Sequence, residues 1–216
     1  TNPVEAEIVG FSMSFENSQA CYIPLKHAER KSEQIDLQEF VSRIRVILED
    51  ESILKIGQNI KYDFIILKGL NVTLKNMDDT MLMSYVLRTG KRGHNLDELA
   101  MDFLSHETIK FSDITTVNKK KVLFSEVNLN DALLYAAEDS DITFRLWEIL
   151  KLELIKNKLY YFYFYIERQL IEIVGMMEIN GCKVNNEHLK KTSEVFQTKI
   201  ELLESNIFEL VGEQFN

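Results

Sequence analysis

The apolar positions between Asn130 and Leu152 recur every three or four residues, which is the repeat of an amphipathic helix. They comprise Leu133, Leu134, Ala137, Ile142, Leu146 and Ile149, and Asn130 is a candidate N-cap. Residues four positions apart share a helix face, so we expect Tyr135 and Asp139 side by side, a phenol above a carboxylate. This face could supply a metal ligand beside a hydroxyl that orients water. The alternative is a solvated face with a tyrosine packed at its edge.

A second pattern joins a strand to a helix. The short apolar run from Ile53 to Ile56, ended by Gly57, predicts a buried strand, and Gln58 or Asn59 can cap a following helix that continues to Leu70. In open α/β sheets, ligands bind where a strand is followed by a helix. Asp63 lies one turn into this helix and is therefore a candidate site residue. The alternative is that its carboxylate only complements the helix dipole.

Further strand and helix patterns alternate along the chain. The segments from Glu7 to Phe15 and from Ala20 to Leu25 predict an antiparallel hairpin. Other expected elements are a helix from Leu37 to Glu49 capped by Asp36, a short strand from Val72 to Leu74, and helices from Met81 to Leu87 and from Asn95 to Leu104. Strands that alternate with helices predict a mixed α/β sheet covered by helices.

The pattern changes after Leu152. Leu154 to Ile179 predicts one long apolar helix, which contains the aromatic run from Tyr160 to Tyr165. These rings would suit stacking on bases if they were exposed, but we expect them to be buried because so many rings would otherwise face water. Asn180 and Gly181 predict a tight turn, and Asn186 to Leu210 predicts a second long amphipathic helix.

Two pairs of polar residues have both a chemical and a structural interpretation. Asp78 and Asp79 could be metal ligands, but acidic residues at the start of a helix usually cap its free amides. His94 and His106 have no partner at zinc-ligand spacing, so we expect solvent-facing or capping histidines.

The stretch between Phe111 and Phe124 is expected to be irregular. It contains Lys119, Lys120 and Lys121, which predict a solvated loop and could also attract DNA phosphate. From its pattern alone, Phe111 would be a core residue.

Composition limits the classes of function. The chain has 216 residues, 45% hydrophobic and 27% charged, with a net charge of −9. This acidity argues against a broad basic surface for nucleic acid but leaves room for a local acidic metal site. Two distant cysteines indicate neither a disulfide framework nor a thiolate zinc site, so we expect a cytoplasmic protein. No apolar run reaches membrane-spanning length, no signal peptide follows Thr1, and the chain is expected to be an excised piece.

Two motifs carry a family resemblance. Gly57 to Asp63 is Gly-Gln-Asn-Ile-Lys-Tyr-Asp, and Tyr135 to Thr143 is Tyr-Ala-Ala-Glu-Asp-Ser-Asp-Ile-Thr. They resemble the second and third exonuclease motifs of the family A DNA polymerases, the group of bacterial DNA polymerase I. Further landmarks keep the family's order: Ile8 to Ser12, Tyr22 to Pro24, Asp79 to Leu82, Ser84-Tyr85 and Ile179 to Gly181.

The resemblance implies a fold and a division into domains. Residues 1–152 would form the proofreading 3′–5′ exonuclease domain, an RNase H-like mixed sheet flanked by helices, without its first strand. Residues 153–216 would begin the polymerase domain, with truncated thumb-type helices forming a long helical hairpin.

It also implies a reaction, the hydrolysis of the terminal phosphodiester of single-stranded DNA with two divalent ions, magnesium or manganese. Asp139 would bind the first ion together with an Asp-x-Glu motif that these 216 residues lack, and Asp63 would bind the second. Tyr135 would orient the attacking water. The DNA 3′ end would be held by Gln58, Asn59, Tyr62 and Phe111.

Because the first motif is absent, we expect this fragment to fold but to be inactive, with its metal sites empty or weakly occupied, while the intact parent is active. Its other partner would be the remainder of the polymerase chain, and no membrane is involved. Three alternatives stay open: a catalytically dead module that supports the polymerase, an RNA-trimming exonuclease of the same superfamily, and an acidic interaction scaffold.

Overall fold

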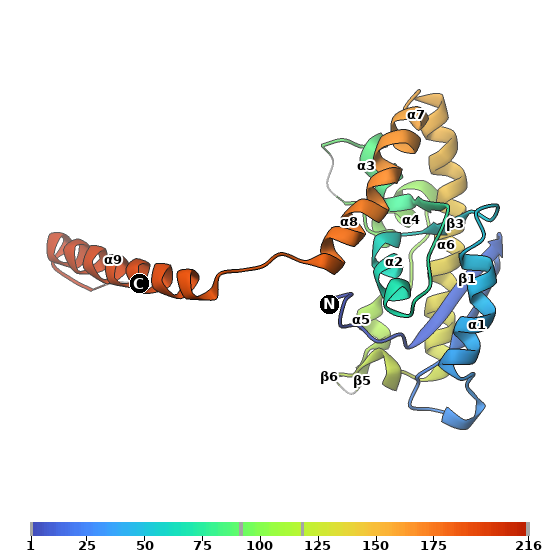
Figure 1. Ribbon diagram of the computed structural model, residues 1–216, viewed down its shortest axis with the longest axis horizontal. Coiled ribbons are helices and arrows are strands. Elements are labelled where there is room, and N and C mark those ends of the chain that lie inside the picture. The colour runs from blue at the N-terminus through green and yellow to red at the C-terminus, as the bar shows by residue number, and fades with distance from the viewer. Residues whose placement is uncertain (1, 91–92, 118, 215–216) are drawn as a thin grey trace. The chain divides into compact units, whose positions relative to one another are not determined.

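The computed structural model describes residues 2–90, 93–117 and 119–214 (Figure 1). The chain forms two compact units, Thr1–Ile179 and Asn180–Asn216. The mixed α/β class is confirmed, with small sheets and many helices in the first unit. The predicted domain boundary at residue 152 lies inside the long helix α6 (Leu129–Lys156), and the first compact unit continues past it.

The predicted N-terminal hairpin is confirmed. Strands β1 (Gly10–Glu16) and β2 (Gln19–Pro24) pair antiparallel, from Gly10 opposite Pro24 to Glu16 opposite Gln19. A short 3-10 turn, η1 (Lys31–Glu33), follows, and then α1 (Leu37–Leu48) begins where the sequence predicts. Asp36 caps α1, because its Oδ1 accepts the N–H groups of Gln38 at 2.8 Å and Glu39 at 3.2 Å.

The predicted strand-to-helix connection follows a strand of a parallel pair. Strand β3 (Lys55–Gly57) leads into α2 (Ile60–Gly69), and β4 (Met77–Asp79) then pairs parallel with β3, Lys55 opposite Met77 and Gly57 opposite Asp79. The predicted strand from Val72 to Leu74 is wrong. Val72 and Leu74 are core residues of a loop. The backbone of this loop forms hydrogen bonds with helices: the Val72 N–H donates to the Leu67 carbonyl and the Lys75 N–H to the Leu48 carbonyl.

Two helices predicted after β4 are confirmed. They are α3 (Thr80–Leu87), capped by Asp79, and α4 (Leu96–Leu104), capped by Asn95. The following stretch, expected to be irregular, contains α5 (Phe111–Ile114), the two-residue strands β5 (Thr116–Val117) and β6 (Lys120–Lys121), and the 3-10 turn η2 (Phe124–Glu126). The strands of the described residues form three two-stranded sheets.

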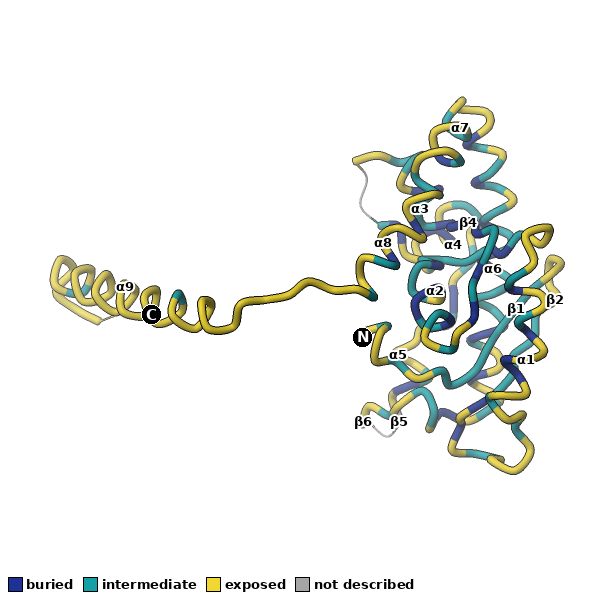
Figure 2. The backbone as a smooth tube through the Cα atoms, in the orientation of Figure 1, coloured by how far each residue is buried: buried dark blue, intermediate teal, exposed yellow. Residues whose placement is uncertain are grey.

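Helix α6 organises the first unit. It packs against β1, β2, β3, α3, α4 and α5, and Figure 1 shows it running alongside these elements. Its cap is Asn128, whose Oδ1 accepts the N–H of Asn130 at 2.9 Å, so the predicted cap at Asn130 is wrong by two residues. Figure 2 shows buried segments on several helices and strands of the first unit, whereas none of the described residues of α9 (Asn186–Val211) is buried. Ile142, Leu146 and Leu150 lie within one core cluster, and Phe40, Phe64 and Val72 lie within another.

The predicted single helix from Leu154 to Ile179 is wrong, because the chain turns at Lys158, which has a left-handed backbone (φ 61°). It continues as α7 (Tyr160–Phe162), a π-helical turn η3 (Tyr163–Glu167) and α8 (Arg168–Asn180). The aromatic run is also more exposed than expected. Tyr163 is fully buried, but Tyr161 is 72% exposed and Tyr165 57% exposed.

The second unit consists mainly of α9 (Asn186–Val211), which confirms the predicted second helix. Asn185 caps it by accepting the N–H of His188 at 3.0 Å. A membrane-crossing helix is not found in the described part of the chain.

Candidate active site

Tyr135 and Asp139 lie on one face of α6, as predicted, and the Tyr135 hydroxyl donates a hydrogen bond to the Asp139 carboxylate. Both side chains are half-buried. Desolvation raises the pKa of Asp139 to about 7, and the negative charges of Glu138 and Asp97 add to the rise, while the Tyr135 hydrogen bond opposes it. Desolvation and the Asp139 charge also raise the pKa of Tyr135. The pair therefore holds a protonated phenol beside a carboxyl group that titrates near neutrality.

An aromatic cluster adjoins this pair. The Phe111 ring stacks on Phe124 with 5.9 Å between centroids, and the edge-on contacts of Tyr135 with Phe111 and Phe124 measure 5.8 Å and 6.1 Å. Phe111 is 52% exposed, so its interpretation as a core residue is wrong. One face of the cluster is thus open to solvent beside the Tyr135–Asp139 pair.

Glu138 fixes the segment before α5 to α6, next to Asp139. Its Oε1 accepts from His106 Nε2 at 2.8 Å, and its Oε2 accepts the N–H of Ile109 at 2.7 Å. His106, expected to face solvent or to cap a helix, is partly exposed, and its ring also pairs with this carboxylate. Glu138 and Asp97 were not predicted to belong to the site, since no local pattern shows that the 97–109 segment packs on this part of α6.

The second group of site residues lies at the β3–α2 corner. The predicted capping of α2 by the Gln58 or Asn59 side chain is wrong: Asn59 adopts a left-handed backbone (φ 57°) and makes no side-chain cap bond. The Gln58 amide instead donates to the backbone carbonyl of His94 at 2.7 Å and accepts from the Thr80 hydroxyl.

The carboxylate of Asp79 caps α2 in their place. Its Oδ1 accepts the N–H of Asn59 at 3.1 Å, and its Oδ2 accepts the N–H of Ile60 at 2.9 Å. Oδ1 also accepts the N–H groups of Met81 at 2.8 Å and Leu82 at 3.3 Å, at the start of α3. One side chain that is 1% exposed therefore joins the first turns of two helices.

Asp63 lies one turn into α2. Its side chain reaches solvent, yet desolvation by the surrounding protein raises its pKa to about 7, and the negative charge of Asp79 adds to the rise. Tyr62 beside it is half-buried. Asp63 and Asp139 are thus two carboxyl groups whose pKa values are raised toward neutrality, which is frequent at functional sites.

Asp78 has a different role from Asp79. Its carboxylate is buried and accepts from Trp147 Nε1 at 2.8 Å and from the Tyr163 hydroxyl at 3.2 Å, and it pairs with Arg168 at 3.0 Å. The capping prediction is confirmed for Asp79 and wrong for Asp78. His94, expected at the surface or in a cap, is also buried, with Nδ1 2.8 Å from the Ser84 hydroxyl and the ring stacked on Tyr85.

The predicted site residues therefore form two groups. In the first group, Tyr135 contacts both Asp139 on α6 and Phe111 on α5. The second group lies around the start of α2 and comprises Gln58, Asn59, Tyr62 and Asp63. Helix α6 packs on β3, the strand that leads into the second group. Among the described residues, no group of three or more His, Cys, Asp or Glu side chains is arranged to hold a metal ion.

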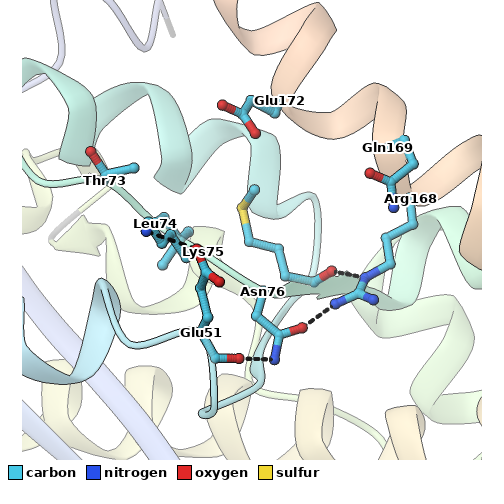
Figure 3. Close-up of a pocket in the computed structure, with 9 residues that line it drawn as sticks. Glu51, Thr73, Leu74, Lys75, Asn76, Arg168, Gln169 and Glu172 are labelled. Carbon is cyan, nitrogen blue, oxygen red and sulfur yellow. Dashed lines mark hydrogen bonds and ion pairs between the residues drawn. The ribbon is translucent and has the colours of Figure 1, made fainter.

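A polar cleft of about 440 Å³ lies elsewhere, between α8 and the segment before β4 (Figure 3). Its lining includes Glu51, Arg168 and Glu172 but none of the predicted site residues. Figure 3 shows the Arg168 guanidinium bonded to the Asn76 side chain and the Met77 carbonyl, and it also pairs with Asp78. Because this guanidinium is already engaged within the protein, we assign the cleft a structural role.

Comparison with known families identifies the class. Residues 1–155 match the 3′–5′ exonuclease family of the type found in family A DNA polymerases. The match covers well over half of the chain, and the chain therefore belongs to this family.

Curated relatives bear the name DNA polymerase I. The relative from Rhizobium leguminosarum is 36% identical, and the match covers 99% of this chain and 23% of the relative. The relative from Pseudomonas aeruginosa is 35% identical, and the match covers 98% of this chain and 24% of the relative. The chain thus spans about a quarter of the length of these relatives.

Two solved structures share the fold. The first is the polymerase domain of Pol1 from M. smegmatis in complex with DNA primer-template and dNTP, with a TM-score of 0.68 at 20% identity. The aligned region covers 91% of this chain and 31% of the Pol1 chain. The second is Brucella melitensis NrnC with bound Mg²⁺, with a TM-score of 0.54 at 20% identity. The aligned region covers 83% of this chain and 76% of the NrnC chain.

Proposed function

We propose that this chain is the proofreading part of a DNA polymerase I, where it hydrolyses the terminal phosphodiester of a single-stranded DNA 3′ end. The observation that carries the proposal is the position of Asp63 and Asp139, two carboxyl groups with raised pKa values: Asp139 is on α6, which packs on β3, and Asp63 is on α2, which follows β3. Membership of the 3′–5′ exonuclease family and relatives named DNA polymerase I along nearly the whole chain support it.

The donor set of the site fits hard divalent cations. Asp63 and Asp139 offer carboxylate oxygens, which suit magnesium or manganese, and a nearby cation would favour their ionised forms. Bound divalent ions would supply an activated water and would neutralise charge on the attacked phosphate. The likeness of the fold to a nuclease structure with Mg²⁺ agrees with this choice of ion.

Two carboxylates are fewer than a pair of octahedral ions requires. Among the described residues, no group of three acidic side chains is arranged to hold a metal ion, so we propose that further carboxylates of the parent protein complete the site. The chain by itself would then bind metal weakly and hydrolyse DNA slowly or not at all.

The remaining residues would hold the substrate and the water. The Tyr135 hydroxyl, which stays protonated at neutral pH, can donate to Asp139 and orient a water beside it. The exposed Phe111 ring offers a stacking surface for a base, a sequence-tolerant contact that suits removal of any mismatched nucleotide. Asn59 and Tyr62 would contact the strand end. Gln58 would act by fixing the corner, because its amide is bonded to His94 and Thr80.

The small sheets fit an RNase H-like arrangement. Helix α6 packs against β1, β2 and β3, so strands of two separate pairs lie against the same helix. We propose that these pairs belong to one mixed sheet in the complete protein, and that residues 153–216 begin the polymerase domain. The relatives named DNA polymerase I extend through this C-terminal part, whereas the exonuclease family match ends at residue 155.

The proposal is tested with a labelled single-stranded DNA and manganese, in the 216-residue chain and in a version extended upstream through the next acidic motif. We expect stepwise loss of 3′ nucleotides in the extended protein, and little or none in the short chain or in the extended protein with Asp139→Asn. A matched RNA strand tests the RNA-trimming alternative. An extended protein that leaves DNA intact and merely folds would instead indicate a structural module.

A further inference from the structure

The β5–β6 hairpin carries an exposed cluster of positive charge. Lys119, Lys120 and Lys121 form the one run of three consecutive basic residues in a chain whose net charge is −9. Lys120 and Lys121 form β6, which pairs with β5, and the three side chains are exposed. Within the described part of the chain, none of them forms an ion pair with a carboxylate. Among the described residues, no carboxylate thus neutralises these charges.

This hairpin is fixed to the aromatic cluster beside Tyr135. The Val122 N–H donates to the Thr115 carbonyl at 2.9 Å, and the Thr115 hydroxyl donates to the Phe111 carbonyl at 2.7 Å. Phe111 precedes the hairpin in the sequence and Phe124 follows it, and their rings stack on each other. Lys121 lies three residues from Phe124, so their Cα atoms are at most about 11 Å apart. The lysines therefore lie near the Phe111–Phe124 ring pair.

The charge of this segment differs from that of the chain as a whole. Residues 110–121 contain four lysines, including Lys110 directly before Phe111, and one acidic residue, Asp113. The Asp113 carboxylate accepts from the Ser112 hydroxyl, and the nearby Glu126 accepts the N–H of Leu123 at 2.9 Å. A positive segment on an otherwise acidic protein would steer a polyanion to this place.

We propose that Lys120 and Lys121 bind backbone phosphates of single-stranded DNA, a few nucleotides before the 3′ end that stacks on Phe111. This inference rests on the proposed function, because it extends the same site along the strand. Lysine contacts to phosphate give affinity and orientation without reading sequence, as removal of any terminal nucleotide requires. The hairpin would thereby favour a single strand long enough to reach both the aromatic cluster and the lysines.

The test compares Lys120→Gln/Lys121→Gln with the unchanged chain, by fluorescence anisotropy with a labelled single-stranded oligonucleotide and with a dinucleotide, at several salt concentrations and without metal. Loss of two phosphate contacts is expected to reduce the slope of log affinity against log salt by about 1.4, since each contact to a single strand contributes about 0.7. Binding of the dinucleotide, which has a single phosphodiester to offer the lysines, is expected to change less than binding of the oligonucleotide.

A matched control removes two lysines elsewhere in the same unit. Lys156→Gln/Lys158→Asn changes the net charge equally, and Lys156 lies 21 residues beyond Tyr135 on α6, about 31 Å along the helix. Asparagine is chosen at position 158 because the backbone there is left-handed. This variant is expected to bind the oligonucleotide with the original slope. Equal slopes in all three proteins would overturn the lysine site alone, whereas an unchanged chain that binds neither ligand would overturn the proposed function as well.

Discussion

The Oδ2 atom of Asp79 accepts the N–H of Ile60 at 2.9 Å, so a side chain at the end of β4 caps a helix that begins 19 residues earlier. The same carboxylate also caps α3, in which it is the N-cap residue. Desolvation raises the pKa of Asp79, while its four backbone N–H bonds act in the opposite direction. Asp79 thus positions the turn that carries Asn59, Tyr62 and Asp63 without being a predicted metal ligand.

Asp79→Asn is expected to lower the free energy of unfolding by about 1–3 kcal/mol. The asparagine amide nitrogen would replace one carboxylate oxygen, so a buried backbone N–H group would lose its acceptor. Asp36→Asn is the matched control. Asp36 caps α1 through Oδ1 alone and at the surface, and asparagine is as good an N-cap there as aspartate. Urea unfolding of both variants measures the difference, and equal losses would contradict the double role of Asp79.

Asp139 gives a prediction for pH dependence. Its folded pKa of about 7 lies above its ordinary value of 3.8, so the folded chain binds more protons than the unfolded chain between these pH values. Without metal, stability is therefore expected to fall as pH rises from about 4 to 7 and to level off above 7. Asp139→Asn should reduce this fall and make the chain more stable than the unchanged protein at pH 8.

Urea unfolding at pH 5 and pH 8, with and without manganese, checks this expectation. Because Asp139 is a proposed metal ligand, a high concentration of manganese should stabilise the unchanged chain slightly more than the Asp139→Asn variant. A variant whose stability depends on pH as steeply as that of the unchanged chain would show that another group accounts for the titration.

The contact between α8 and α2 gives a prediction for packing. A Cβ atom added at Gly175 would lie 2.7 Å from Cδ1 of Phe64, a ring that is 1% exposed and directly follows Asp63. Gly175→Ala is expected to cost about 1–3 kcal/mol through overpacking. Gly69→Ala in α2 is the control, because no atom lies within 4 Å of the added Cβ, and it should be neutral or slightly stabilising. Thermal unfolding that ranks the two variants in the opposite order would refute this packing.

The buried pair of Arg168 and Asp78 gives a fourth prediction. Their side chains are 11% and 4% exposed, so Arg168→Met leaves a buried carboxylate with only Trp147 and Tyr163 as donors. The expected loss of stability is about 3–5 kcal/mol. Arg43→Met removes an exposed pair with Glu39 and should cost less than about 1 kcal/mol. Chemical denaturation of both variants provides the comparison, and similar midpoints would argue against a structural role for Asp78.

Local signals account for the elements that the sequence predicts correctly. Asp36, Asp79 and Asn95 each cap a helix that starts directly after them, and the four-residue spacing of Tyr135 and Asp139 places both on one face of α6. These features depend on neighbours in the sequence, so a single sequence suffices to predict them.

The errors concern contacts between distant segments. Val72 and Leu74 resemble a strand because both are buried, but the core and not a sheet buries them. The turn at Lys158 has neither glycine nor proline to indicate it. The capping of α2 by Asp79 and the proximity of Asp97 to Asp139 arise only when separate elements pack together. The local elements that carry the candidate site residues were therefore easier to predict than the side chains that hold these elements in place.

The measurement that tests the central claim most directly follows manganese-dependent removal of 3′ nucleotides from single-stranded DNA by the upstream-extended protein and its Asp63→Asn and Asp139→Asn variants. Folding of each protein is confirmed by unfolding curves. We predict stepwise shortening by the unchanged extended protein and loss of most of that activity in both variants. Undiminished activity in the two folded variants would contradict the assignment of Asp63 and Asp139 as the carboxylates of the nuclease site.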